Sequence, residues 1–160
     1  MTKPRRIEWD ERAPAAANAR HHLPRLMADY FVAVRQLLAG GPAPPKLHQV
    51  RLASKRVRYT LELFRQCYGP GLEARLEALR ELQQVLGKVN DATTARRLLA
   101  KAMNAKSPQS QRVQKFLDER ATHKALEFRK HWDEVFDAPG QLGWWTGYLA
   151  RHTRATGRRA

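Results

Sequence analysis

The sequence is poor in acidic residues. It has 15 Asp and Glu against 30 Lys and Arg among 160 residues, which gives a net charge of +15 at pH 7. Such an excess of cations favours a polyanionic partner, because opposite charge both steers and strengthens association. Nucleic acids, phosphate polymers and acidic membrane surfaces all meet this condition, and composition does not choose among them.

Disulfides, long apolar runs and a signal peptide are also lacking. Cys67 is the single cysteine, which excludes an internal disulfide and fits a reducing cytosol. We expect it to be a small buried apolar side chain. No apolar run approaches the roughly 18 residues of a membrane span, and the charged N-terminus is unlike a signal peptide. The sequence therefore predicts a cytoplasmic protein of one domain.

Metal-binding and catalytic motifs are missing as well. His21 and His22 are adjacent and would point apart on a helix, and His123 and His131 lie two turns apart without a second ligand at i+4. There is no glycine-rich phosphate loop, no nucleophile elbow and no acidic set near the basic residues to hold Mg²⁺. We therefore expect no metal site, no cofactor and no enzymatic activity.

Apolar residues recur with helical spacing in four stretches, and no alternating strand pattern is visible. The predicted helices cover about 23–39, 46–68, 71–104 and 109–136. Segments rich in Gly, Pro, Asn and Ser separate them, and Ser107 before Pro108 is a typical helix start. The predicted fold class is all-α, an antiparallel four-helix bundle with short connections.

The chain ends are predicted to differ from the bundle. We expect residues 1–22 to be a loose basic arm with a short helix around Ala15–His22, residues 23–150 to form the bundle, and residues 151–160 to be a basic tail. Pro24 would lie in the first turn of the first long helix. Gly87 interrupts the third helix, which tight packing or a kink would explain. Trp144 and Trp145 are expected to cap the core or to form a dimer contact.

The second predicted helix carries two stripes side by side. Its apolar side is Leu47, Val50, Ser54, Val57, Leu61 and Phe64, where polar Ser54 could mark a close helix contact. One residue later, with the same 3, 4, 3 spacing, come His48, Arg51, Lys55 and Arg58. They occupy the adjacent arc, where their stems can cover apolar surface while their heads project. Glu62 falls in the same arc.

A row of cations about one turn apart, or about 5.4 Å, suits a polymer of phosphates. Arginine offers a planar fork for two phosphate oxygens, and lysine offers a compact charge. A neutral His48 donates one hydrogen bond, and a nearby polyanion would favour its protonated form. The alternative is a solvated charged face headed by a histidine, and spacing alone leaves both interpretations open.

Three segments resemble those of one known family. "LHQVRLASKRVRY" (47–59) resembles the signature helix of the conserved histidine α-helical domain (CHAD) family, in which arginine follows a histidine by three residues and further Lys/Arg lead to Arg-Tyr. "LQQVLGKVNDATTARRLL" (82–99) is similar to the next signature, a Leu-Gly pair followed by Asn-Asp or Arg-Asp. "HWDEVFDAPGQLGWW" (131–145) resembles the aromatic closing segment. The resemblance covers about 23–145.

The resemblance implies an all-helical fold that binds inorganic polyphosphate in a basic groove. Matched residue by residue, its basic positions are His48, Arg51, Lys55 and Arg58, with Arg56 and Lys88 as weaker matches. On the first long helix, the candidates that could face the same groove are Arg20, Arg25 and Arg35. The usual domain has two similar bundles around a pseudo-twofold axis, whereas this chain resembles only the second. Either one bundle suffices or two chains form a homodimer that rebuilds the symmetry.

Three functions follow as hypotheses. The first is non-catalytic polyphosphate binding, with residence on polyphosphate granules. The second is nucleic-acid binding without sequence specificity, which basic charge serves equally well, although the stripe lacks interleaved aromatic residues for base stacking. The third is an accessory subunit of a polyphosphate-metabolising enzyme.

Overall fold

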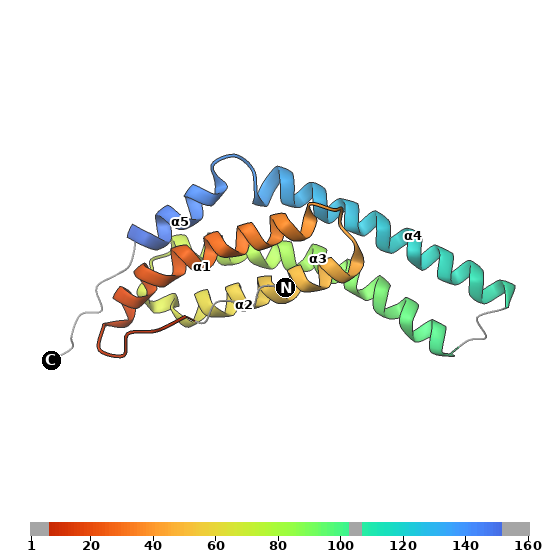
Figure 1. The fold of residues 1–160 in the computed structure, drawn as a ribbon, viewed down its shortest axis with the longest axis horizontal. Helices are drawn as coiled ribbons and strands as arrows, with labels where there is room; N and C mark the ends of the chain where they lie inside the picture. Colours follow the sequence, from red (N-terminus) through yellow and green to blue (C-terminus); the bar gives the residue numbers. More distant parts are fainter. Residues whose placement is uncertain (1–6, 103–106, 152–160) are drawn as a thin grey trace.

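Five α-helices make up the fold of the described residues. The computed structural model describes residues 7–102 and 107–151, and these ranges contain helices and no strands. The elements are α1 (Ala15–Leu38), α2 (Pro44–Leu63), the 3-10 helix η1 (Arg65–Cys67), α3 (Gly71–Ala102), α4 (Pro108–His131), the π-helix η2 (Trp132–Phe136) and α5 (Gln141–Arg151) (Figure 1). The predicted all-α bundle is confirmed, and α5 is an addition to the four predicted helices.

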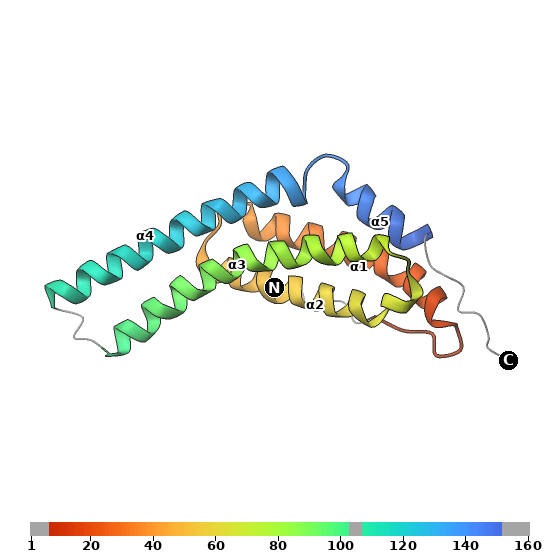
Figure 2. The same ribbon diagram turned by 180° about the vertical axis from the view of Figure 1, so that it is seen from behind.

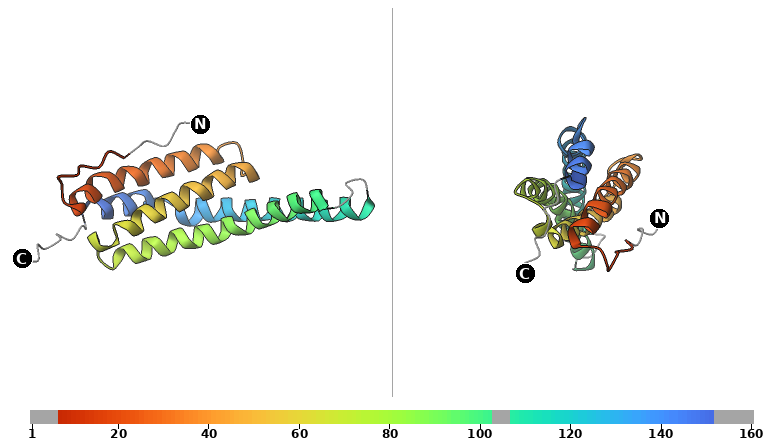
Figure 3. Two further views of the ribbon diagram at one scale, coloured as in Figure 1. Left: turned by 90° about the horizontal axis from the view of Figure 1, so that it is seen from below. Right: turned by 90° about the vertical axis from the view of Figure 1, so that its left-hand side faces the viewer.

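The helices pack as an elongated bundle. α2 contacts α1 and α3, α4 runs along α3, and α5 packs on α1. α3 and α4 continue past the ends of α1 and α2 as a two-helix projection (Figures 1 and 2). Figure 3 shows that only these two helices reach the far end of the molecule. Apolar side chains there, such as Leu98 and Phe116, remain exposed because no third helix covers them.

Aromatic rings fill the core where α1, η2 and α5 meet. Phe136 lies 5.4 Å from Phe31, 5.1 Å from Trp132 and 5.6 Å from Trp145, measured between ring centroids. Trp145 is buried, which confirms that it closes the core, whereas Trp144 is 40% exposed.

α1 is longer than predicted. It begins at Ala15 rather than near residue 23, and Pro24 lies inside it rather than in its first turn. Ala16 and Ala19 extend the apolar face upstream and are buried. Their packing therefore outweighs the backbone hydrogen bond that Pro24 cannot make.

Residues 7–14 pack on the bundle and do not form part of a loose arm. The Asn18 side chain accepts a hydrogen bond from the Asp10 N–H (2.9 Å) and donates one to the Asp10 carbonyl (2.8 Å). The Trp9 ring lies 5.0 Å from Phe64 and 5.1 Å from His22. These contacts hold the segment against α1 and the end of α2. The rest of the predicted arm, residues 1–6, and the predicted tail beyond Arg151 lie outside the described residues.

A buried polar contact joins α1 to α2. The hydroxyls of Tyr30 and Ser54 lie 2.6 Å apart, and Ser54 also donates to the Val50 carbonyl (2.8 Å). Burial raises the pKa of Tyr30. Ser54 is fully buried, which confirms that the one polar residue of the apolar side marks a close helix contact.

A buried arginine holds α5 against α3. Arg75 donates to the Gly71 carbonyl (3.0 Å) and to the Trp144 carbonyl. Its guanidinium carbon lies 3.7 Å from the centroid of the Trp144 ring and 3.8 Å from that of Tyr148. Burial lowers the pKa of Arg75, and cation–π attraction to the two rings offsets part of the lost hydration.

The structure also tests three predictions about single residues. Ser107 caps α4 by accepting a hydrogen bond from the Ser110 N–H (3.1 Å), as predicted. Cys67 is buried, as predicted, and burial raises the pKa of its thiol. Gly87 is not tightly packed, because a Cβ added there would meet no atom within 4 Å. Tight packing is therefore the wrong explanation for this glycine.

Candidate functional site

The strongest candidate residues lie along one side of α2. We call His48, Arg51, Lys55 and Arg58 the basic stripe. The neighbouring apolar side of α2 is buried, so the stripe begins at the edge of the core. His48 is exposed, whereas the three cations are partly buried. This is the arrangement expected when long stems cover apolar surface and charged heads project.

Three members of the stripe have no acidic partner. Within residues 7–102 and 107–151, no ion pair or side-chain hydrogen bond involves His48, Arg51 or Lys55. Their positions are separated by about 4.5 to 6 Å along the helix axis, at about 1.5 Å per residue. Two unpaired cations and an imidazole at this spacing can bind an anion that carries charge at short intervals.

Glu62 connects the other end of the stripe to α3. Its carboxylate lies 3.3 Å from Nη1 of Arg58 and 3.7 Å from Nη2 of Arg80. Arg80 also donates to Glu77 (2.9 Å), and this hydrogen bond raises the pKa of Arg80. Glu62 and Glu77 together balance the charges of Arg58 and Arg80, so the unpaired positive charge of the stripe lies at Arg51 and Lys55. Sequence reasoning missed Arg80, because its place beside the stripe depends on how α3 lies against α2.

Ion pairs define the register of α2 against α3. Glu62 of α2 pairs with Arg80 of α3, and Arg65 of η1, which follows α2, pairs with Glu73 of α3 (2.5 Å). The two helices therefore run antiparallel, with Glu62 beside Arg80. The same register brings Lys55 level with the turn of α3 that contains Gly87. A Cβ at Gly87 would meet no atom within 4 Å, so no neighbouring side chain crowds this turn of α3.

The two weaker candidates lie on other surfaces. Arg56 is exposed on the outer side of α2, away from the core. Lys88 is exposed on α3 and lies near Glu127 of α4. The pKa of Glu127 is lowered first by its hydrogen bond from Lys124 and also by the charge of Lys88. The structure thus places Lys88 on the α4 side of α3 and does not bring it to the stripe.

The three candidates on α1 are exposed but separate from the stripe. Arg35 donates to both carboxylate oxygens of Asp137 (2.7 and 2.5 Å), which joins α1 to the segment after η2. Burial is the main cause of the raised pKa of Tyr68, and the charge of Arg20 opposes it. Burial is also the main cause of the lowered pKa of His22, and the charge of Arg25 adds to it. No contact among the described residues joins any of the three to the stripe.

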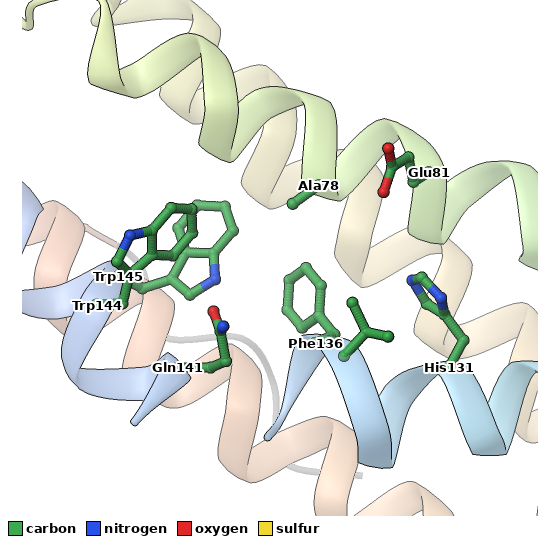
Figure 4. A pocket seen from close by; sticks show the side chains of 8 residues that line it. Ala78, Glu81, His131, Phe136, Gln141, Trp144 and Trp145 are labelled. Carbon is green, nitrogen blue, oxygen red and sulfur yellow. The ribbon is translucent and has the colours of Figure 1, made fainter. Parts of the chain in front are cut away.

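A small pocket lies on another side of α3. It has a volume of about 150 Å³ and lies between α3, η2 and α5. Glu81 and His131 lie at one end and the Trp144 and Trp145 rings at the other (Figure 4). Its polar groups include a carboxylate and no member of the stripe, so it does not extend the basic site.

No group of three or more His, Cys, Asp and Glu side chains in residues 7–102 and 107–151 could hold a metal ion. In the same part of the chain, no helix has the length and apolar character needed to cross a membrane.

The basic stripe falls within a part of the chain that matches a known family. A family model of the CHAD domain matches residues 3–100. The chain belongs to the CHAD family. In this CHAD protein the match contains α1, α2 and most of α3, and therefore the whole stripe. The aromatic segment 131–145 lies beyond it. No curated protein and no solved structure matches the chain.

Proposed function

We propose that this CHAD protein binds inorganic polyphosphate along the basic stripe and does not turn it over. The observation that carries the proposal is the line of His48, Arg51 and Lys55, which has no acidic partner in the described part of the chain. A linear polyphosphate carries charge on every unit, so its oxygens can follow donors one helical turn apart. Membership of the CHAD family supports this ligand class.

The donor types also suit this ligand. Arg51 and Arg58 can each hold two phosphate oxygens with a planar fork, and Lys55 supplies a compact charge between them. The imidazole of His48 donates one hydrogen bond when neutral and adds a cation when protonated. A row of four donors favours a chain of phosphates over a single phosphate, because a chain engages several donors at one entropic cost.

Binding without turnover is the interpretation that the charges support. Hydrolysis or synthesis of a phosphate polymer normally needs acidic side chains that hold Mg²⁺ beside the ligand. The acidic residue that the ion pairs bring to the stripe is Glu62. Its carboxylate is already paired with Arg58 and Arg80. We infer that the protein is a binding module that resides where polyphosphate accumulates, such as granules. We also infer that two chains pair and combine their stripes.

A second candidate ligand is single-stranded nucleic acid. Tyr59 is 53% exposed beside the stripe, with the guanidinium of Arg58 4.8 Å from its ring centroid. An exposed aromatic ring next to cations can stack on a base. A single ring gives less support to this candidate than the row of donors gives to polyphosphate.

The test is a titration with long-chain polyphosphate and with single-stranded RNA, matched in total phosphate, at low and high salt. The stripe variant carries Arg51→Ala, Lys55→Ala and Arg58→Ala. A matched control carries Arg97→Ala, Lys101→Ala and Arg112→Ala, which removes the same charge from exposed positions on the projection.

We expect polyphosphate to bind the parent more tightly than RNA at the higher salt, and only the stripe variant to lose this preference. Equal binding of RNA and polyphosphate, or equal losses in the two variants, would contradict the proposal. In either case the stripe would be a general charged face.

A further inference from the structure

The solvent-facing side of α2 carries an apolar row next to the basic stripe. Leu52, Tyr59 and Leu63 are exposed by 53, 53 and 77%. Together with exposed Arg56, they follow spacings of 4, 3 and 4 and occupy an arc of about 60° opposite the buried face, at about 100° per residue. We call these four residues the outer row. Apolar side chains this exposed on one face of a helix indicate a contact surface.

We propose that the outer row is the surface on which a second copy of this chain docks when polyphosphate is bound. The proposal rests on the proposed function and adds the surface and the register through which two chains pair. The row reads Leu-Arg-Tyr-Leu along α2, and this order is self-complementary about its midpoint. If two α2 helices pack antiparallel, Leu52 faces the partner's Leu63 and Arg56 faces the partner's Tyr59. Twofold symmetry then repeats both pairs.

Both pairs are chemically favourable. The leucine pair covers Leu52 and Leu63, which are 53 and 77% exposed, and so removes apolar surface from water. The guanidinium of Arg58 lies against the Tyr59 ring, 4.8 Å from its centroid. The opposite face of that ring can therefore receive the partner's Arg56, because a cation is attracted to either face of an aromatic ring.

The same pairing brings the two basic stripes together. A twofold axis that relates antiparallel helices is perpendicular to both helices and to the line joining them. It therefore keeps the same flank of each helix on one side of the pair. The stripe lies on the α3 flank of α2, as the Glu62–Arg80 ion pair shows. Two stripes thus line one side of the dimer, and each copy contributes donors to a shared site.

Contact area and charge make this dimer depend on the anion. Residues 52–63 span about 16 Å of helix, and three apolar side chains cover far less than the roughly 800 Å² per partner of a standard interface. Two chains that each carry a net charge of +15 also repel one another. A polyphosphate lying across both stripes neutralises this charge and contacts both copies. Binding and pairing are therefore thermodynamically linked.

The first test measures binding and mass in the same samples. A short polyphosphate of defined length is added to the full chain, its binding is followed by anisotropy of a terminal label, and the mass of the complex is measured by sedimentation. The test variant is Leu63→Arg, which adds a cation to the outer row and therefore does not weaken attraction to the anion. The control is Leu98→Arg, which adds the same charge at an exposed leucine on the projection.

We expect the parent and Leu98→Arg to form complexes of two chains. Leu63→Arg should still bind polyphosphate, but as one chain and more weakly than Leu98→Arg, because binding and pairing are linked. Chains held side by side only by the polymer would not respond to Leu63→Arg. A two-chain complex of Leu63→Arg, or a one-chain complex of the parent, would overturn the docking surface and leave polyphosphate binding standing. Absence of polyphosphate binding by the parent would overturn the proposed function itself.

The second test measures the register. Leu52→Cys and Leu63→Cys chains, one of them carrying a tag, are mixed with polyphosphate under mild oxidation. The native Cys67 is buried and stays out of the reaction. We expect disulfides between the two variants and few within either one, because antiparallel pairing brings position 52 close only to position 63. Equal cross-linking of Leu52→Cys with itself would contradict the antiparallel arrangement.

Discussion

The carboxylate of Glu62 lies 3.3 Å from Nη1 of Arg58, inside the basic stripe. It is also 3.7 Å from Arg80 on the neighbouring helix. Glu62 therefore orients two cations and at the same time lowers the positive potential around them. Since attraction of a polyanion depends on that potential, Glu62 is a position at which binding can be strengthened rather than weakened.

The first prediction is that Glu62→Gln tightens polyphosphate binding. The change removes a negative charge but keeps the size of the side chain, and a unit charge about 5 Å away in water is worth about 0.8 kcal/mol. We expect affinity at low salt to rise about fourfold by this reckoning, and the gain to shrink as salt increases. The control is Glu134→Gln on η2, which changes a carboxylate that is paired with Lys130 of α4. An equal gain in both variants would show that only net charge matters.

The second prediction concerns His48. Its exposed imidazole can donate a hydrogen bond to a bound phosphate, and His48→Ala removes this donor but keeps Arg51, Lys55 and Arg58. We expect the variant to lose about 0.5–1.5 kcal/mol of polyphosphate binding free energy, as for one hydrogen bond. Anisotropy titrations at one pH measure the loss. His123→Ala, on α4, should bind like the parent, and parental affinity of His48→Ala would remove His48 from the site.

The third prediction tests the contact between α1 and α2. Ser54→Ala leaves the buried Tyr30 hydroxyl without its 2.6 Å partner, which should lower the free energy of unfolding by about 1–3 kcal/mol. Tyr30→Phe should cost less, because Ser54 still donates to the Val50 carbonyl. Urea unfolding of both single variants and the double variant measures the coupling. Additive losses would mean that the two hydroxyls do not interact.

The fourth prediction follows from the raised pKa of Tyr30. An unfolded tyrosine ionises near pH 10, whereas buried Tyr30 keeps its proton at that pH. The stabilisation that comes from keeping Tyr30 neutral in the folded state is therefore complete below about pH 10. As pH rises further, the free energy of unfolding falls by up to about 1.4 kcal/mol per pH unit. Unfolding free energies above pH 10 should fall less steeply for Tyr30→Phe than for the parent. The exposed Tyr59→Phe serves as the control and should keep the parental slope.

The fifth prediction concerns Arg75, which links α3 to α5. Lysine keeps the charge but loses the planar group between the Trp144 and Tyr148 rings. Arg75→Lys should therefore lower the free energy of unfolding by about 2 kcal/mol or more and shift tryptophan emission as Trp144 moves. Polyphosphate affinity should stay unchanged, because this contact lies away from the stripe. An unaltered melting temperature would show that α5 is held by its apolar contacts alone.

The boundaries of α1 and α5 show where reasoning from the sequence stopped. Pro24 predicted a helix start, but the buried Ala16 and Ala19 continue the helix upstream. Alanines add little to the apolar periodicity of a sequence, and the stability that they give a helix depends on what packs against them. α5 was missed for a related reason, since its place on α1 depends on a long-range contact through Arg75 and Trp144.

The sequence by itself determined the all-α class, the buried face of α2 and the basic stripe beside it, because a regular helix converts residue spacing directly into position around one axis. Only the tertiary structure decided that Arg80 joins the stripe, that Lys88 faces α4 and that Arg35 is engaged by Asp137. Those outcomes depend on the register and rotation of one helix against another. Both are determined by the packing of many side chains at once, and no spacing within a single helix encodes them.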